Sequence, residues 1–276
     1  MPRQTRTILA NCAAGGLLLC SGVQAQDSDL VLEEVLVTAQ KRVQSLEDVP
    51  LTVSAIAGES VNDYLSGAQD IRALAARVPG LNVETSNGRT QPRFYLRGQG
   101  NIDFDVNANQ PVAFVFDDIY FENNTLRSVP LFDIERVEVL KGPQGSLFGR
   151  NTNAGAIVIT SVKPSLERDG YGRFAYGSRG TWNVEAASNF GLTETFSMRA
   201  SVKYQERDEW IDNTFTGPGD DFGGFQETAW RLQFRWAPTD SFEGNLKLHG
   251  FDQEGTDPNV FYANAIQQGS PGLRPG

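Results

Sequence analysis

The chain is poor in the residues that most often carry chemistry. Its 276 residues include two cysteines, Cys12 and Cys20, and one histidine, His249. Both cysteines fall in the N-terminal stretch, so the rest has no thiol for a disulfide framework or a thiolate metal site. No nucleophile motif and no cluster of metal ligands occurs. We therefore expect no catalytic residue, no cofactor and no metal site, which disfavours an exported enzyme.

A long apolar run is also absent. The apolar stretch at 13–19 is well short of the roughly 20 residues that a membrane-spanning helix needs. It follows Arg3 and Arg6 and precedes Val23-Gln24-Ala25, which has the small-residue spacing of a signal peptidase site. We expect residues 1–25 to be a cleaved signal peptide. A lipidated Cys20 is disfavoured, because the residue before it should be small and Leu19 is not.

Basic residues are in the minority, 24 against 34 acidic ones. Loss of Arg3 and Arg6 with the leader would make the balance more negative still. A nucleic-acid partner is therefore not expected, because it would need a basic surface. An exported chain without cysteines is typical of the bacterial envelope rather than of small disulfide-stapled secreted domains.

Residues 26–49 are polar and acidic, which is typical of a flexible arm. The exception is the β-prone run Val35, Leu36, Val37 and Thr38, which has no turn and no partner strand beside it. Proteins usually hide an unpaired strand. The run could be a disordered tail, a strand folded back on the next domain, or a segment left free to join the sheet edge of another protein.

Residues 50–164 alternate between helical and strand-like patterns. Ile71, Leu74, Ala75 and Val78 have the spacing of an amphipathic helix that ends at Pro79-Gly80. Strand-like runs follow at 81–83, 93–96, 112–116, 136–140 and 156–162. This is enough apolar material for one small core.

From Tyr171 onward the apolar residues alternate with polar ones, as along 196–205, 230–236 and 242–248. A soluble sheet with one wet face is one interpretation. A transmembrane barrel is favoured by the strand lengths and by the aromatic residues near strand ends. It is also favoured by the loops, because two short turns (191–195 and 238–241) lie at the end opposite one long polar loop (208–227). About five strands are present, the first at 172–176, and five cannot close. The chain is expected to be the N-terminal piece of a longer protein.

Three motifs resemble chemical sites but are incomplete. Gly98-Gln99-Gly100 lacks the third glycine of a dinucleotide fingerprint. Asp103, Asp105 and Asn107 have the spacing that begins a calcium loop, but Ala108 stands where glycine is needed. We expect a surface loop at 98–110. The pairs Asp117-Asp118 and Glu135 with Glu138 sit at strand ends, where solvated carboxylates are the simplest interpretation.

Four segments resemble, in order, the N-terminal part of a TonB-dependent outer-membrane receptor. Residues 34–39 resemble the TonB box, and Tyr95-Leu96-Arg97-Gly98 resembles an Arg-Gly motif of the plug. Residues 134–143 and 149–155 resemble the strand, turn and Asn-rich segment that close the plug.

The resemblance implies an α+β plug domain followed by the first antiparallel strands of a transmembrane β-barrel of 22 strands. The ranges would be 1–25 for the signal peptide, 26–42 for a periplasmic arm, 43–164 for the plug, and 171–276 for the start of the barrel. By motif, Arg97 and Lys141 would pair with acidic barrel residues beyond Gly276. Lysine at the second position lacks the planar fork of the arginine usual there.

The implied function is energy-coupled uptake of a scarce nutrient, with a ferric siderophore or another iron complex as the expected cargo. A vitamin, a carbohydrate and a truncated, transport-incompetent fragment remain alternatives. The implied partners are TonB with its inner-membrane energising complex, the cargo, and outer-membrane lipid. The TonB-binding residues would be Glu34, Val35, Leu36, Val37, Thr38 and Ala39. The plug loop facing the substrate would present Gln99, Asn101, Asp103, Asp105 and Asn107.

Overall fold

The computed structural model describes residues 36–38, 42, 44–65, 70–85, 88–103, 105, 108–212 and 221–255. These residues belong to one compact unit, Glu34–Gly276. The expected signal peptide lies outside the described residues, as do four of the predicted site residues, Glu34, Val35, Ala39 and Asn107. Within the described ranges, no helix is long and apolar enough to cross a membrane.

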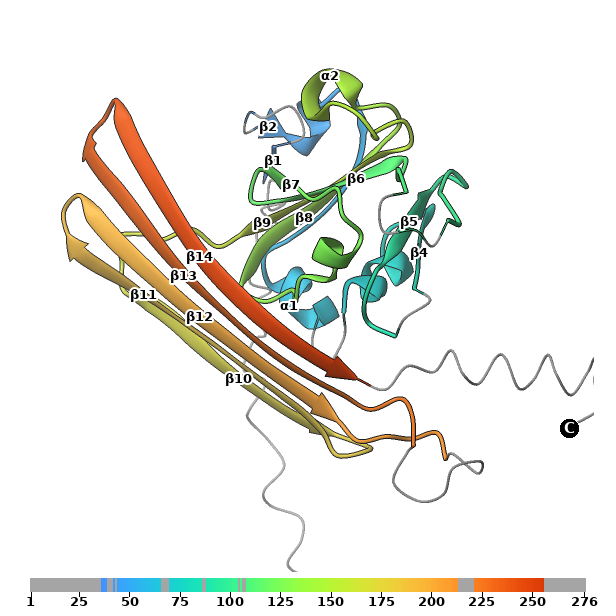
Figure 1. Ribbon diagram of the computed structural model, residues 1–276. Coiled ribbons are helices and arrows are strands. Elements are labelled where there is room, and N and C mark those ends of the chain that lie inside the picture. The colour runs from blue at the N-terminus through green and yellow to red at the C-terminus, as the bar shows by residue number, and fades with distance from the viewer. Residues whose placement is uncertain are drawn as a thin grey trace, which may run out of the picture. The chain divides into compact units, whose positions relative to one another are not determined.

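The first half of the described chain is a mixed helix and sheet region, which we call the α/β domain (Figure 1). Its main sheet has the order β3-β8-β9-β6-β7, in which only the β6–β9 pair is parallel. A second, two-stranded sheet is β4-β5. The elements are β3 (Thr52–Ala57), α1 (Glu59–Leu65), η2 (Ile71–Ala76), β4 (Leu81–Glu84), β5 (Arg93–Leu96), β6 (Val112–Phe116), β7 (Ile119–Tyr120), η3 (Thr125–Ser128), β8 (Ile134–Lys141), α2 (Gly145–Phe148) and β9 (Gly155–Ser161).

The main sheet is buried on both faces, which explains the uninterrupted apolar run of β6. Phe114 and Phe116 join one apolar cluster, whereas Ala113 and Val115 belong to another, because successive side chains point to opposite faces. Gly155, at the start of β9, has a φ of +150°, and a Cβ there would lie 2.1 Å from the carbonyl oxygen of Leu140. This close approach of β8 and β9 therefore requires glycine.

The helix expected from Ile71 to Val78 is a 3₁₀ helix, η2, rather than an α-helix. The Asp70 side chain accepts a hydrogen bond from the backbone N–H of Arg72 and begins the helix. Ile71, Leu74 and Val78 are buried as the spacing predicts. The periodicity thus identified the inward face, and the short segment adopts the tighter helix that short pieces often form.

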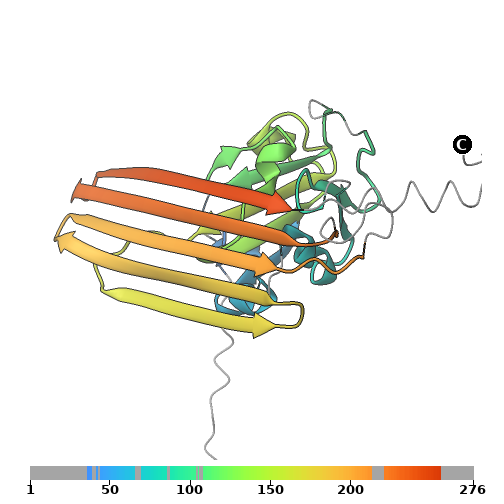
Figure 2. The ribbon, with the colours of Figure 1, turned by 60° about the horizontal axis from the view of Figure 1, so that its bottom comes forward.

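The second half is an antiparallel sheet of five long strands in chain order, which we call the long sheet (Figure 2). Its strands are β10 (Asp169–Gly177), β11 (Thr181–Thr193), β12 (Phe196–Arg207), β13 (Phe225–Thr239) and β14 (Phe242–Gly255). The expected strand at 172–176 is the middle of β10. The long connection between β12 and β13 lies at one end of the sheet, and the short turns β11–β12 and β13–β14 lie at the other.

The arm before the α/β domain is not the free segment that the sequence predicts. Leu36–Val37 forms a strand, β1, that pairs antiparallel with β2 (Gln44–Ser45), and η1 (Leu46–Asp48) follows. Val37 is fully buried and Val49 is 8% exposed. The expectation of a flexible arm up to Val49 and of a strand without a partner is therefore wrong for these residues. The apolar side chain of Val37 packs in the cluster that contains Leu140 and Val115.

Candidate functional site

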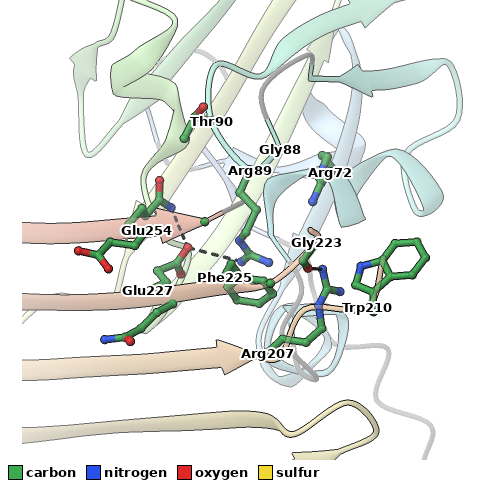
Figure 3. Close-up of a pocket in the computed structure, with 14 residues that line it drawn as sticks. Arg72, Gly88, Arg89, Thr90, Arg207, Trp210, Gly223, Phe225, Glu227 and Glu254 are labelled. Carbon is green, nitrogen blue, oxygen red and sulfur yellow. Dashed lines mark hydrogen bonds and ion pairs between the residues drawn. The ribbon is translucent and has the colours of Figure 1, made fainter. Parts of the chain in front are cut away.

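A pocket of about 340 Å³ lies between the α/β domain and the end of the long sheet that carries the long connection (Figure 3). The α/β domain contributes Arg72 and the turn that holds Arg89. The long sheet contributes Arg207 from the end of β12 and Phe225 from the start of β13, with Trp210 from the segment between them. Sequence reasoning did not identify this pocket, because its residues come from segments far apart in the chain.

The Phe225 ring lies against two of the arginines. The guanidinium carbon of Arg89 is 3.9 Å from the ring centre, and that of Arg207 is 5.0 Å from it. A fourth arginine, Arg179 from the β10–β11 turn, lies 4.6 Å from the centre of the Trp210 ring. Such stacking holds guanidinium groups in place without neutralising them.

Two carboxylates hold the arginines of the α/β domain side. Asp70 binds Arg72 at 2.6 Å and lies 3.9 Å from Arg89. Burial alone would raise the pKa of the Asp70 carboxyl, but the hydrogen bond from Arg72 and the charges of Arg89 and Arg72 outweigh it and leave the pKa below its ordinary value. Asp70 is therefore ionised at neutral pH, and its stabilising contribution is lost only as the pH falls through this lowered pKa.

Glu227 is the second carboxylate, and its side chain is only 2% exposed. It lies 3.5 Å from Arg89 and 3.6 Å from Lys203, and it accepts a 2.7 Å hydrogen bond from Gln253. A buried carboxylate is stable only when it is paired in this way. Glu227 thus connects the α/β domain to three strands of the long sheet.

Further along the interface, three basic residues of the long sheet bind three consecutive residues of the α/β domain, a contact we call the seam. Both oxygens of the Asp133 carboxylate accept hydrogen bonds from Arg199, at 2.8 and 2.6 Å. Lys203 donates to the carbonyl oxygen of Leu131 at 3.0 Å, and Arg231 donates to that of Phe132 at 3.1 Å. The side chains of Asp133 and Arg199 are 0% and 3% exposed, so this pair is fully desolvated.

A further ion pair joins Lys247 of β14 to Asp117 at 3.0 Å. The Asp117 side chain is 4% exposed and also accepts hydrogen bonds from the backbone and hydroxyl of Ser161. The prediction of a solvated carboxylate is therefore wrong for Asp117. It is wrong for Glu138 as well, which is fully buried.

The structure describes three residues of the predicted TonB box: Leu36 and Val37, which form β1, and Thr38. Thr38 is bound by Glu138. The backbone N–H of Thr38 donates to Oε1 of Glu138 at 2.6 Å, and the Thr38 hydroxyl lies 3.2 Å from both carboxylate oxygens. Arg136 donates to Glu138 at 3.1 Å and to the Thr38 hydroxyl at 3.2 Å. The described part of the predicted box, residues 36–38, is therefore docked on β8 rather than free.

The predicted contact residues Arg97 and Lys141 lie near each other but make no ion pair with any described residue. Arg97 is exposed, and partial burial together with the charge of Arg97 lowers the pKa of the Lys141 ammonium. The expected pairing, of basic plug residues with acidic barrel residues, thus stays a prediction for these two positions. At the seam the signs are the reverse, because the long sheet supplies the cations.

The predicted substrate loop does not line the pocket. Gln99, Asp103 and Asp105 are exposed, and Asn101 donates to the carbonyl oxygen of Asn109 at 2.9 Å. Asn101 and Asp103 each accept a hydrogen bond from the backbone N–H two residues later, which is the pattern of local turns. Within the part of the chain that the structure describes, no three His, Cys, Asp or Glu side chains are grouped so as to hold a metal ion.

Comparisons with known proteins place these features in a family context. Residues 45–156 match the model of the TonB-dependent Receptor Plug Domain. The chain is 32% identical over 244 residues to the pesticin receptor of Yersinia pestis, covering 85% of the chain and 34% of that receptor. It is 26% identical over 255 residues to the vitamin B12 transporter BtuB of Vibrio vulnificus, covering 90% of the chain and 39% of the transporter.

Among solved structures, the ferric yersiniabactin uptake receptor FyuA of Yersinia pestis superimposes with a TM-score of 0.68 at 24% sequence identity. The match covers 75% of the chain and 32% of that receptor. At this identity the superposition establishes the fold. The chain spans about a third of the length of the relatives it matches.

Proposed function

Because the chain belongs to the family of TonB-dependent receptors, we propose that the full-length protein takes up a scarce nutrient across the bacterial outer membrane with energy supplied through TonB. The α/β domain is the plug, and the long sheet is the first part of the transmembrane barrel. The proposed cargo is a ferric siderophore or another iron complex. The name of the ferric yersiniabactin uptake receptor favours this class over a vitamin, although the match to BtuB keeps the vitamin as the second candidate.

The observation that carries the proposal is the polar contact between the two regions. The face of the long sheet that meets the α/β domain presents Arg199, Lys203, Arg231 and Gln233, and each is no more than 3% exposed. A plug held by ion pairs and hydrogen bonds can exchange these partners for water when it moves. A plug fused to the wall by an apolar core would lose that stabilisation outright.

The predicted TonB box must leave its docked position before another protein can pair with it. A partner strand would need the backbone groups of Leu36 and Val37, which now pair with Ser45 and Gln44. Release would also break the bonds between Thr38 and Glu138. The docked box therefore supports a receptor in its resting state, with the box as a segment made available on demand. We expect export through residues 1–25 and residence in the outer membrane.

The test is a proline in the box of the full-length protein. Leu36→Pro removes a backbone donor from a strand that must pair edge to edge, so energised uptake should fall to the level of a strain without TonB. Surface binding of the cargo should be unchanged. Uptake of radiolabelled iron complex and its binding to whole energy-depleted cells measure the two separately.

Arg42→Pro is the matched control, because Arg42 is exposed and lies outside residues 34–39. It should leave both uptake and binding intact. Normal uptake by Leu36→Pro would contradict the assignment of the box. Equal loss in both variants would show that the arm as a whole, rather than residues 34–39, is required.

A further inference from the structure

We propose that the pocket formed by Arg72, Arg89 and Arg207 binds a carboxylate of the cargo, so that the transported complex carries a net negative charge. This inference rests on the proposed function and narrows its substrate class. Three features carry it: a pocket arginine without a carboxylate partner among the described residues, a buried nitrogen of that arginine without a hydrogen bond, and a position open to ligands arriving from outside.

The carboxylates near the pocket pair with Arg72 and Arg89 and form no ion pair with Arg207 among the described residues. Asp70 is bound by Arg72, and Glu227 is shared among Arg89, Lys203 and Gln253. Glu254, which also lines the pocket, points away from the arginines in Figure 3. Asp70 and Glu227 are thus already paired with cations other than Arg207.

Arg207 is the cation left over. Its one hydrogen bond among the described residues runs from Nη2 to the carbonyl oxygen of Gly223, at 2.8 Å. Its Nε is buried and has no hydrogen-bond partner in the described part of the chain, and no described carboxylate forms an ion pair with it. Arg89, Arg179 and Arg72 repel its charge, and the attraction of Asp70 is weaker than each of these repulsions. A buried donor on an uncompensated cation requires an acceptor, and a carboxylate supplies one with the geometry that arginine binds best.

The rest of the pocket suits a planar acidic group. Phe225 and Trp210 line it with apolar rings, together with Gly223 and Gly224. A Cβ at Gly223 would lie 2.2 Å from the indole nitrogen of Trp210, so this approach requires glycine. The volume of about 340 Å³ is at the small end of ligand sites, which fits one acidic arm of a chelate rather than the whole complex.

The pocket lies where a ligand from outside arrives first. Outer-membrane barrels carry their long loops on the extracellular side and their short turns on the periplasmic side. The pocket is at the end of the long sheet that carries the β12–β13 connection and the β10–β11 turn, opposite the short β11–β12 and β13–β14 turns. Arg207 and Phe225 have the strand parity of Lys203 and Glu227, which face the α/β domain and not lipid.

The experiment uses the full-length receptor, purified in detergent and titrated by calorimetry with four complexes. These are ferric citrate and a ferric catecholate, both negative, a positively charged ferric trihydroxamate, and neutral cyanocobalamin. We expect binding to be confined to the negative complexes. Arg207→Gln should weaken the tightest binder by about tenfold or more, the value of a charge-assisted hydrogen bond. Arg150→Gln, which removes an exposed arginine on the α/β domain, should change nothing.

If Arg207→Gln does not fold, the affinity of Arg72→Gln for the negative complexes tests the same pocket. Arg72→Gln is expected to fold, because the Arg72 side chain is 44% exposed and its removal leaves the strand ends intact. The proposal is overturned if the positive or neutral complex binds most tightly, if no negative complex binds, or if the pocket variants bind as the native receptor does. Energised uptake of a positive or neutral cargo that Leu36→Pro abolishes would overturn this inference and leave the proposed transport function standing.

Discussion

The α/β domain and the long sheet are built from the same residue types with opposite placement. In the α/β domain Phe94, Phe114 and Leu140 are fully buried. In the long sheet Phe174 is 64% exposed and Leu246 56% exposed, whereas Gln205 and Gln233 are fully buried. The domain hides apolar surface from water, and the sheet turns apolar surface outward and polar surface inward, as a barrel wall does between lipid and a wet lumen.

This difference shows that the two regions meet through polar groups because each has already used its apolar residues elsewhere. The domain buries them in its own core, and the sheet directs them outward. Only the polar face of the sheet remains to hold the domain. The stability of the plug within the barrel then depends on a few desolvated pairs, each of which is costly to break singly.

The largest expected effect is at the seam. Arg199→Ala would leave the buried Asp133 carboxylate without its partner, at a cost of about 3–5 kcal/mol. Thermal unfolding of the full-length protein in detergent should show the plug melting earlier than the barrel. Arg235→Ala is the control, because its pair with Glu243 is exposed and contributes about 0–1 kcal/mol. Equal shifts for the two variants would show that the seam does not hold the domain.

The outward face of the sheet offers the next test. Leu248, near the middle of β14, is 45% exposed, and Leu248→Arg would be nearly neutral on a soluble sheet. In lipid the same change should cost about 2–4 kcal/mol, because it places a charge near the bilayer midplane. Folding of the full-length protein into lipid vesicles at a series of urea concentrations measures this. A cost below 0.5 kcal/mol, a value far under the lipid estimate, would contradict the outward orientation of the apolar face.

The smallest expected effect concerns the docked box. Glu138→Ala removes the acceptor of the Thr38 backbone and hydroxyl bonds, so the box should open about tenfold more often. The labelling rate of a Val37→Cys reporter by a thiol reagent, in isolated outer membranes, reports this opening. Glu135→Ala is the matched control, because Glu135 also binds Arg136 but is 41% exposed and does not contact the described part of the box. Equal labelling rates in both variants would show that Glu138 does not hold the box in its docked position.

The sequence predicted the elements better than their contacts. Strong local patterns identified β6, β8 and β9 and the alternation of β12 to β14, because each depends on neighbouring residues alone. The sequence left open that this strand folds back on the next domain, but it did not identify Glu138 as the partner of Thr38, since the two lie 100 residues apart. The alternation along 196–205 and 230–236 separates a polar from an apolar face of each strand, but it carries no information on what the polar face meets.

The pocket was missed for a related reason. Arg89 lies in a short polar turn that no motif distinguishes, and Arg207 ends an alternating strand. Their proximity follows only from the register of β12 with β13, where Arg207 is opposite Phe225. The residues of the predicted loop at 98–110 are adjacent in sequence and form a recognisable pattern, whereas the residues of the pocket are adjacent only in space.

Two of the three basic residues at the seam bind main-chain carbonyl oxygens, those of Leu131 and Phe132. A carbonyl oxygen is present whatever side chain its residue carries, so Lys203 and Arg231 can keep their hold while positions 131 and 132 change during evolution. Asp133 and Arg199 bind through both side chains, so a substitution of one requires a compensating substitution of the other. Relatives with different residues at 131 and 132 should therefore keep the contact between the two regions. Correlated substitutions should identify only the pair Asp133 and Arg199, although the interface includes three consecutive residues.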